Sequence, residues 1–162
     1  MLLTDKICKY ATLQEATRPE VARQYGTDNQ PTPEHLENLK YLGLKVFDPV
    51  REFVGGPLHG FWYRNAIVNA ATPGASKFSQ HMLGQAVDID CDVYKHGTNR
   101  DVFNYIVKNL EFDQIIWEAG TDQNPDWVHV SIIHPGKGIN RRKITRMTRS
   151  NGQPVYSDFK VL

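Results

Sequence analysis

The sequence predicts a single α+β domain over residues 1–162, in which helices flank a small antiparallel sheet. A chain of 162 residues, 40% hydrophobic and 23% charged, is long enough and apolar enough to build one core. Apolar residues recur every three or four positions over 36–54 and 102–110, as in amphipathic helices. Runs rich in β-branched residues between 85 and 133 indicate strands. Because helices bracket strands that look antiparallel, the class is α+β.

Residues 1–31 are polar and irregular, and we expect them to form an N-terminal arm that packs over the core. A turn sequence at 28–31, Asp-Asn-Gln-Pro, ends this arm. Thr-Pro-Glu at 32–34 then combines a capping residue, a first-turn proline and an acid, which predicts the start of a long helix. The apolar face of this helix continues to Val54, with a kink or a second helix start expected at Pro49.

The rest of the chain contains shorter elements. Asn-Gly at 151–152 is a frequent type I′ turn pair and predicts a closing hairpin within the C-terminal segment 137–162. The other expected elements are a short strand over 58–64, a short helix over 65–71, a strand over 85–93, a helix capped by Thr98 or Asn99, and strands over 112–118 and 127–133.

Charge and composition exclude several classes of partner. The formal net charge is only +1, which gives no field strong enough to predict binding to nucleic acid or to a membrane. The segment 137–149 is locally basic and could contact phosphates or an anionic polymer. We interpret it instead as a solvated basic face, because no nucleic-acid motif accompanies it. Its cations are Lys137, Arg141, Arg142, Lys143, Arg146 and Arg149.

The two cysteines, Cys8 and Cys91, are too few for a disulfide framework or a cysteine-rich metal site. The N-terminus lacks the apolar run of a signal peptide, and no stretch approaches the roughly 20 apolar residues of a membrane span. We therefore expect synthesis in the cytoplasm without a signal peptide, no membrane span, and a monomeric protein.

The segment 79–90 holds the first candidate metal ligands. His81 and Asp88 lie seven residues apart, with Gly84 and Ala86 between them. A glycine turn leading into a strand would let the imidazole and the carboxylate converge on one ion. Asp90 lies on the same strand face as Asp88 and competes with it for the carboxylate position.

The third candidate ligand is His129. Alternation along the strand over 127–133 places Trp127, His129 and Ser131 on one face. Two histidines and one aspartate suit Zn²⁺, and three protein ligands leave a fourth position open, as in catalytic zinc sites. The sequence therefore predicts a zinc site at the sheet. The remaining histidines are expected to be structural: His35, His59, His96 and His134.

These motifs carry a resemblance to a known family. The pattern Ser79-x-His81-x-x-Gly84-x-Ala86-x-Asp88, followed by Asp126-x-x-His129, resembles the zinc D-Ala-D-Ala carboxypeptidase and L-alanyl-D-glutamate endopeptidase family. The similarity is nearest to small, single-domain members encoded by bacteriophages and prophages. It also covers Asp48-Pro49-Val50-Arg51-Glu52, Tyr63-Arg64 and Phe112-Asp113-Gln114-Ile115-Ile116-Trp117-Glu118.

The resemblance implies a zinc peptidase that hydrolyses the stem peptides of peptidoglycan. It implies that His81, Asp88 and His129 bind zinc and that Asp126 is the catalytic base. Arg64 would be the electrophilic partner of the reaction and would contact substrate. The Asp-x-x-His pattern is similar to that of the endopeptidases, so both carboxypeptidase and endopeptidase activity stay open.

Three alternatives accompany this reading. Glu118, at the end of a predicted strand, is an alternative base to Asp126. Ser79 could hydrogen-bond substrate or merely cap the turn before His81. A module without catalytic activity, serving in wall binding or in the virion, would keep the same fold. In either case the protein would reach the wall after lysis or as a component of the virion.

Overall fold

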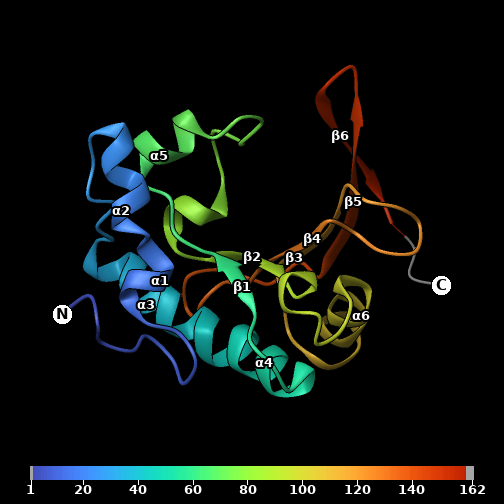
Figure 1. The fold of residues 1–162 in the computed structure, drawn as a ribbon, viewed down its shortest axis with the longest axis horizontal. Helices are drawn as coiled ribbons and strands as arrows, with labels where there is room; N and C mark the ends of the chain where they lie inside the picture. Colours follow the sequence, from blue (N-terminus) through green and yellow to red (C-terminus); the bar gives the residue numbers. More distant parts are fainter. Residues whose placement is uncertain (1, 160–162) are drawn as a thin grey trace.

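A six-stranded mixed sheet organises residues 2–159, which are the residues that the computed structural model describes (Figure 1). The strand order is β1-β2-β4-β3-β5-β6. All neighbouring strands are antiparallel except β3 and β5, which run parallel. The strands are β1 (His59–Phe61), β2 (Ala86–Asp90), β3 (Gln114–Glu118), β4 (Trp127–Ser131), β5 (Lys143–Ser150) and β6 (Gln153–Asp158).

The expectation of a wholly antiparallel sheet is wrong at β5. Because β3 and β4 are antiparallel, β4 ends beside the start of β3. The connection over 132–142 stays at this end of the sheet, where the backbone N–H groups of Arg141 and Lys143 both donate to Asp113. The chain thus passes to the free side of β3 and starts β5 level with the start of β3, which makes the two strands parallel.

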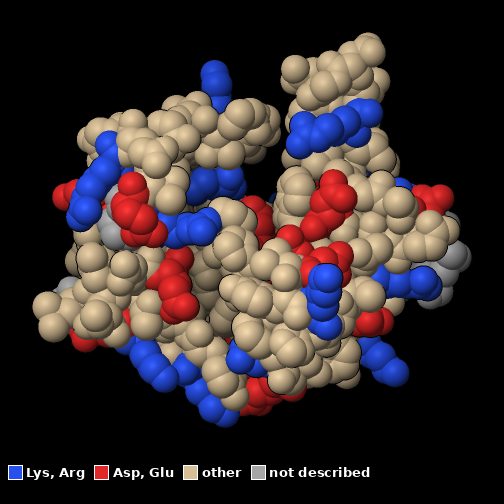
Figure 2. Space-filling view, viewed as in Figure 1, with Lys and Arg blue, Asp and Glu red and all other residues tan. Residues whose placement is uncertain are grey.

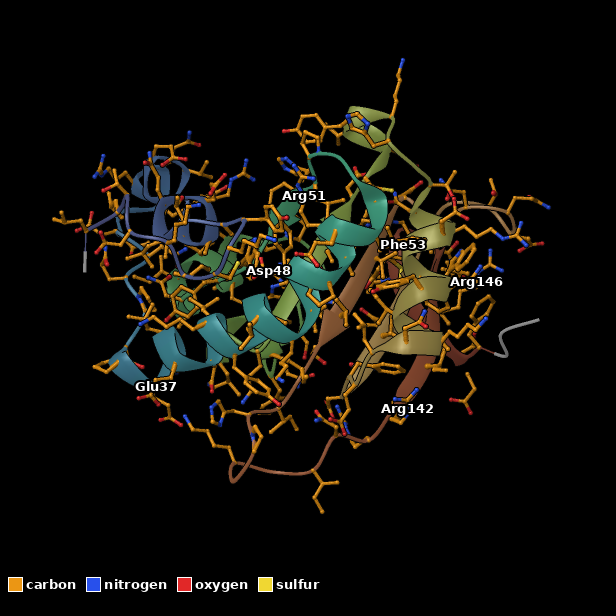
Figure 3. The ribbon with its side chains drawn as sticks, turned by 90° about the horizontal axis from the view of Figure 1, so that it is seen from below. Glu37, Asp48, Arg51, Phe53, Arg142 and Arg146 are labelled. Atoms are coloured by element: carbon orange, nitrogen blue, oxygen red, sulfur yellow. The ribbon has the colours of Figure 1, made fainter. Side chains whose placement is uncertain are left out.

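Three helices cover one face of the sheet (Figure 3). They are α3 (Pro33–Leu42), α4 (Asp48–Val54) and α6 (Asn99–Asn109). A π-helical turn, η2 (Gly43–Phe47), joins α3 to α4, so the second helix starts at Asp48, next to Pro49 as predicted. Thr98 caps α6 by accepting a hydrogen bond from the backbone N–H of Asp101. The core between these helices and the sheet includes Val87, Ile89, Ile115, Val128 and Val130, all fully buried.

The N-terminal arm is more regular than expected. It contains α1 (Leu13–Thr17), α2 (Pro19–Ala22) and a 3₁₀ turn, η1 (Arg23–Tyr25). Thr12 and Glu15 form a capping box at the start of α1. Helices this short carry too few residues for a recognisable apolar period. The arm does pack on the core, as predicted, through buried side chains such as Leu13 and Ala16.

The remaining predicted elements are confirmed. The helix over 65–71 is α5 (Ala66–Ala71), which Asn65 caps. Asn151 and Gly152 join β5 to β6 with φ values of 51° and 78°, as a type I′ turn requires. Two further 3₁₀ turns are η3 (Gln80–Leu83) and η4 (Asp92–Tyr94). The last residues of the segment 137–162 lie outside the described part of the chain. No helix within residues 2–159 is long and apolar enough to cross a membrane.

The face of the sheet opposite the helices is the floor of a cleft of about 910 Å³. One wall comes from the arm, α5 and the loop over 72–79, and the other is the projecting β5–β6 hairpin (Figure 1). The space-filling view shows the hollow between these walls, with basic side chains on both sides of it (Figure 2). The molecule is thus a single α+β domain with one sheet face covered and the other available to a ligand.

We predict that Gly84→Ala destabilises the fold more than Gly55→Ala. Both glycines have left-handed φ values, 68° and 70°. A Cβ at position 84 would lie 2.5 Å from the carbonyl oxygen of His35, whereas a Cβ at position 55 would meet nothing within 4 Å. The expected loss in free energy of unfolding is about 1 kcal/mol for Gly55→Ala and about 3 kcal/mol for Gly84→Ala. Urea unfolding of both variants measures the difference, and equal losses would contradict it.

Candidate metal centre

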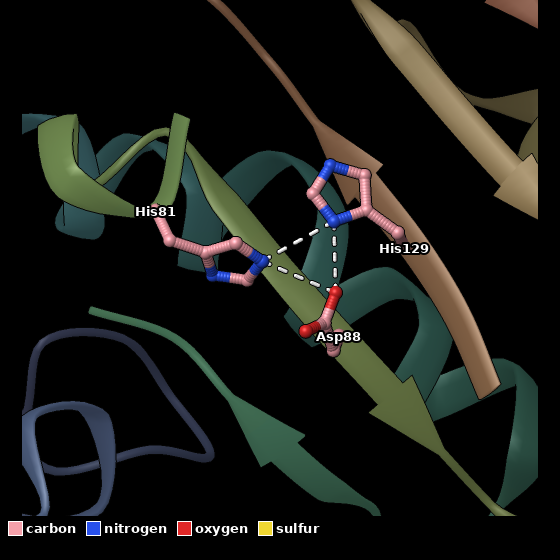
Figure 4. Close-up of side chains that lie close together, drawn as sticks. All are labelled: His81, Asp88 and His129. Atoms are coloured by element: carbon pink, nitrogen blue, oxygen red, sulfur yellow. Dashed lines mark hydrogen bonds and ion pairs between the residues drawn. The ribbon is translucent and has the colours of Figure 1, made fainter. Parts of the chain in front are cut away.

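His81, Asp88 and His129 meet at the floor of the cleft (Figure 4). Asp88 on β2 and His129 on β4 are direct cross-strand partners, so their side chains rise side by side from the open face of the sheet. His81 comes from η3, the turn that leads into β2. Its ring reaches over the strand to the other two side chains. The predicted convergence of these three residues is confirmed.

The three facing atoms are close to one another and shielded from solvent. His81 Nε2 lies 3.1 Å from Asp88 Oδ1 and 3.2 Å from His129 Nδ1, and the latter two atoms are 2.8 Å apart. The side chains of His81, Asp88 and His129 are 1%, 18% and 11% exposed. Three ligand atoms gathered around one point in a pocket could hold a metal ion.

The protein backbone orients His81. Its Nδ1 lies 2.5 Å from the carbonyl oxygen of Trp62, which can only accept a hydrogen bond. Nδ1 therefore carries the proton, and Nε2 presents its lone pair to the cluster. Such a backbone contact is the usual means by which proteins fix the tautomer and the ring orientation of a metal-binding histidine.

Charge and burial keep two of the ligands in the forms that bind metal. Burial lowers the pKa of His81, although the neighbouring Asp88 opposes this. For Asp88, burial alone would raise the pKa, but His81 and His129 together hold it well below its usual range. A neutral imidazole and an ionised carboxylate are the protonation states that coordination requires.

The other predicted metal candidates have different partners. Asp90 Oδ1 accepts hydrogen bonds from Asn99 Nδ2, at 3.1 Å, and from the backbone N–H of Asp92, at 3.0 Å. It is not part of the metal-binding group. His35 Nδ1 lies 3.0 Å from the hydroxyl of Tyr63. Within residues 2–159, none of the four remaining histidines joins the group.

Arg64 and Ser79 line the same cleft. The hydroxyl of Ser79 accepts a bond from the backbone N–H of His81, at 3.4 Å, so Ser79 caps the ligand turn. It also lies 3.5 Å from an Arg64 guanidinium nitrogen. Burial lowers the pKa of Arg64, and the negative charges of Asp88 and Glu118 oppose this.

Asn29 holds the backbone on either side of Arg64. Its side-chain amide donates to the carbonyl oxygen of Tyr63, at 2.9 Å, and accepts from the backbone N–H of Asn65, at 2.7 Å. The same amide donates to the carbonyl oxygen of Thr17 in α1. Asn29 is 2% exposed. The N-terminal arm thus fixes the segment that carries Arg64.

The two candidate bases, Asp126 and Glu118, differ in exposure and in their position relative to the cleft. Asp126 is exposed and, in the part of the chain that is described, does not line the cleft. It lies just before β4, where its backbone N–H donates to the carbonyl oxygen of Glu118, at 2.9 Å. Glu118, by contrast, lines the cleft and is 7% exposed. Burial raises its pKa to about 7. Of the two candidate bases, Glu118 is therefore the one that lines the cleft together with the metal-binding group.

No known protein-family model matches the chain, and no curated protein is significantly similar to it. The geometry of the cleft therefore carries the functional argument.

Sequence reasoning missed the contribution of the β5–β6 hairpin. Met147 of β5 pairs with both Glu118 and Tyr156, so these three side chains share one row across the open face. Met147, Arg149 and Tyr156 line the cleft. The Asn-Gly turn indicated the hairpin itself, but no local signal indicates that it lies beside β3.

We predict that Asp88→Asn and His129→Gln abolish stoichiometric binding of a divalent metal ion. Each change removes one of only three ligands, whereas Asp90→Asn alters an acid outside the group and serves as the matched control. Wild-type protein and Asp90→Asn should bind one Zn²⁺ per chain, and their melting temperatures should rise when the ion is added. Elemental analysis and thermal unfolding with and without chelator measure both effects. Equal metal content in all four proteins would exclude this site.

We predict a pH-dependent stability difference between metal-free wild-type protein and Glu118→Gln. The pKa of the Glu118 carboxyl group is about 7 in the folded protein, whereas the ordinary pKa of a glutamate side chain is 4.5. The folded state therefore holds this proton more tightly, and the stabilisation is complete below pH 4.5 and lost as the pH rises to about 7. Glutamine stays neutral, so between these pH values the variant should gain about 3 kcal/mol relative to wild type. Urea unfolding at pH 4.5 and pH 8 tests this, and a difference independent of pH would contradict it.

Proposed function

We propose that the protein is a zinc-dependent peptidase that hydrolyses peptide bonds in the stem peptides of peptidoglycan. The observation that carries this proposal is the position of the His-Asp-His group. It lies at the floor of a long cleft, and a buried carboxyl group and a half-buried guanidinium line the same cleft. A structural metal site would normally be closed and would not share a cleft with a potential base.

The donor set supports zinc as the ion. Two imidazole nitrogens and one carboxylate oxygen are ligands that Zn²⁺ accepts, with bonds of about 2.0–2.2 Å. Tetrahedral coordination at these lengths separates neighbouring donor atoms by roughly 3.3 Å. The spacings of 2.8, 3.1 and 3.2 Å in the protein are close to this value. His81, Asp88 and His129 would hold the ion and leave one position towards the cleft.

Zinc in such a site polarises a substrate carbonyl group and makes water more acidic. Glu118 would take up the proton of the attacking water and deliver it to the leaving amine. Its buried position in the same cleft suits both roles. Arg64 would offset the negative charge that develops on the carbonyl oxygen, which is commonly worth about 3 kcal/mol. Ser79 would keep the Arg64 side chain oriented.

The cleft and the motif resemblance together support a peptide substrate from the cell wall. A cleft of about 910 Å³ accommodates several residues of an extended chain. The Ser79-to-Asp88 motif resembles the wall peptidases, and both carboxypeptidase and endopeptidase action are compatible with this proposal. Such an enzyme would reach the wall after lysis or on the virion.

We predict that Glu118→Gln abolishes hydrolysis, whereas Asp126→Asn keeps it. Removing the proposed base should lower kcat by about 10²–10⁴-fold without loss of zinc. Asp126→Asn changes an exposed acid nearby and should stay within about threefold of wild type. The assay incubates each zinc-loaded protein with purified peptidoglycan and with stem peptides, and measures new amines and free D-alanine with and without chelator.

The opposite result, an active Glu118→Gln and an inactive Asp126→Asn, would return the role of base to Asp126. If wild-type protein releases no chelator-sensitive product from several wall types, a wall-binding or virion-structural module is favoured over an enzyme.

A further inference from the structure

The basic segment over 137–149 is not a uniform solvated face. Most of its cations are engaged by other parts of the protein, and Figure 3 shows Arg142 and Arg146 on the helix-covered side, away from the cleft. Lys137 pairs with Glu34 and Glu37, Arg141 with the buried Asp113, Arg142 with the carbonyl oxygens of Val107 and Leu110, and Arg146 with Asp122. Four of the six charges therefore have structural partners.

The other two cations, Lys143 and Arg149, both belong to β5 and both line the cleft. Their side chains are exposed and make no hydrogen bond or ion pair with any residue between 2 and 159. Residues two, four and six apart in a strand share one face, so both side chains rise from the face that carries the metal ligands. Arg141 also lines the cleft but is held by Asp113, so Lys143 and Arg149 are the cations of this segment that stay available to a ligand there.

Strand register places these two charges on either side of the metal-binding group. Thr145 of β5 lies in the same cross-strand row as Ile116, His129 and Asp88. Lys143 is two residues before this row and Arg149 is four residues after it. At about 3.3 Å per residue, these offsets are roughly 7 Å and 13 Å along the strand. Because β3 separates β5 from β4, both cations lie roughly 10 Å to one side of His129 across the sheet, at about 4.8 Å per strand. A peptide lying between the metal-binding group and the β5–β6 hairpin would therefore meet one cation before and one cation after the row of His129.

We propose that Lys143 and Arg149 bind free carboxylates of an acidic peptide substrate, on opposite sides of the bond that is cleaved. This inference rests on the proposed peptidase function and adds the chemical class of its substrate. Arginine can contact a carboxylate through two parallel hydrogen bonds, and such charge-assisted bonds are about twice as strong as neutral ones. Tyr156 lines the cleft next to Arg149 and offers its hydroxyl as an additional donor.

The number of free cations favours an acidic peptide over a nucleic acid or another polyanion. Binding of a polyanion depends on many simultaneous phosphate contacts. Five cations line the cleft, but Arg141 is paired with Asp113 and Arg18 lies over the ring of Phe61. Lys143 and Arg149 therefore remain beside the half-buried Arg64, which is few for a polyanion. Aromatic side chains that suit the apolar parts of a peptide also line the cleft: Tyr25 of the arm, Phe61 of the edge strand β1 and Phe78 of the loop over 72–79. The net charge of +1 adds no general attraction for polyanions.

The test compares two stem peptides of equal length on zinc-loaded protein. In one, all carboxylates are free. In the other, every carboxylate except the C-terminal one is an amide. Wild type should prefer the acidic peptide in kcat/KM by about tenfold or more. Lys143→Gln and Arg149→Gln should each lower kcat/KM for the acidic peptide about tenfold and change the amidated peptide less than twofold. Arg100→Gln is the matched control, because it removes an exposed charge on α6 outside the cleft.

A binding measurement separates this inference from the proposed activity. Calorimetry gives the Kd of the acidic peptide for Glu118→Gln protein, with and without Arg149→Gln. If wild type hydrolyses neither peptide but Arg149→Gln weakens binding about tenfold, the binding of peptide carboxylates by this residue stands and the proposed peptidase function fails. If both peptides are cleaved equally and the β5 variants match Arg100→Gln, the inference fails and the peptidase function stands. Tighter binding of an oligonucleotide through the same two residues would also overturn it.

Discussion

The register between β2 and β4 is the constraint on which the site depends. Asp88 and His129 are separated by 41 residues but are direct partners across two antiparallel strands. A slip of one residue would turn one of these side chains towards the helices and replace it with a valine or an isoleucine. The alternating Val87, Ile89, Val128 and Val130, all buried against the helices, make such a slip costly because it would expose apolar side chains. The hydrophobic core therefore specifies the geometry of the polar face above it.

Local sequence signals predicted most of the helices, strands and turns, because each depends on neighbours in the chain. Caps at Thr32 and Thr98, the Asn-Gly turn and the glycine between His81 and Asp88 all act within a few residues.

Long-range pairing was not predictable in the same way. The parallel placement of β5 beside β3 follows from the anchoring of the connection at Asp113, and it decides that Met147, Arg149 and Tyr156 line the cleft. The sequence placed Asp126 close to His129 along the chain, but it could not show that Asp126 is exposed and that Glu118 lines the cleft.

The basic segment illustrates how the same charges acquire different roles once the chain is folded. Arg141 binds Asp113, whose other oxygen also accepts from Gln80 Nε2 at 3.1 Å, so this cation supports the turn that carries His81. Burial raises the pKa of the Asp113 carboxyl, but hydrogen bonds from Arg141 lower it more, and the pair therefore stays ionised. A count of lysines and arginines in the sequence cannot separate a charge that is held by another side chain from one that is available to a ligand. The distinction requires the partner, and the partner lies elsewhere in the chain.

The hydrogen bonds of Asn29 to the backbone on both sides of Arg64 make the first 31 residues part of the cleft. The buried Asn29 amide hydrogen-bonds the carbonyl oxygen of Thr17 and the backbone of Tyr63 and Asn65. The arm is therefore linked directly to the segment that carries Arg64. Shortening the protein from its N-terminus would remove this tether and leave Arg64 free to sample other rotamers, even with all three metal ligands intact. Minimal versions of this domain should therefore retain the arm as part of the cleft wall.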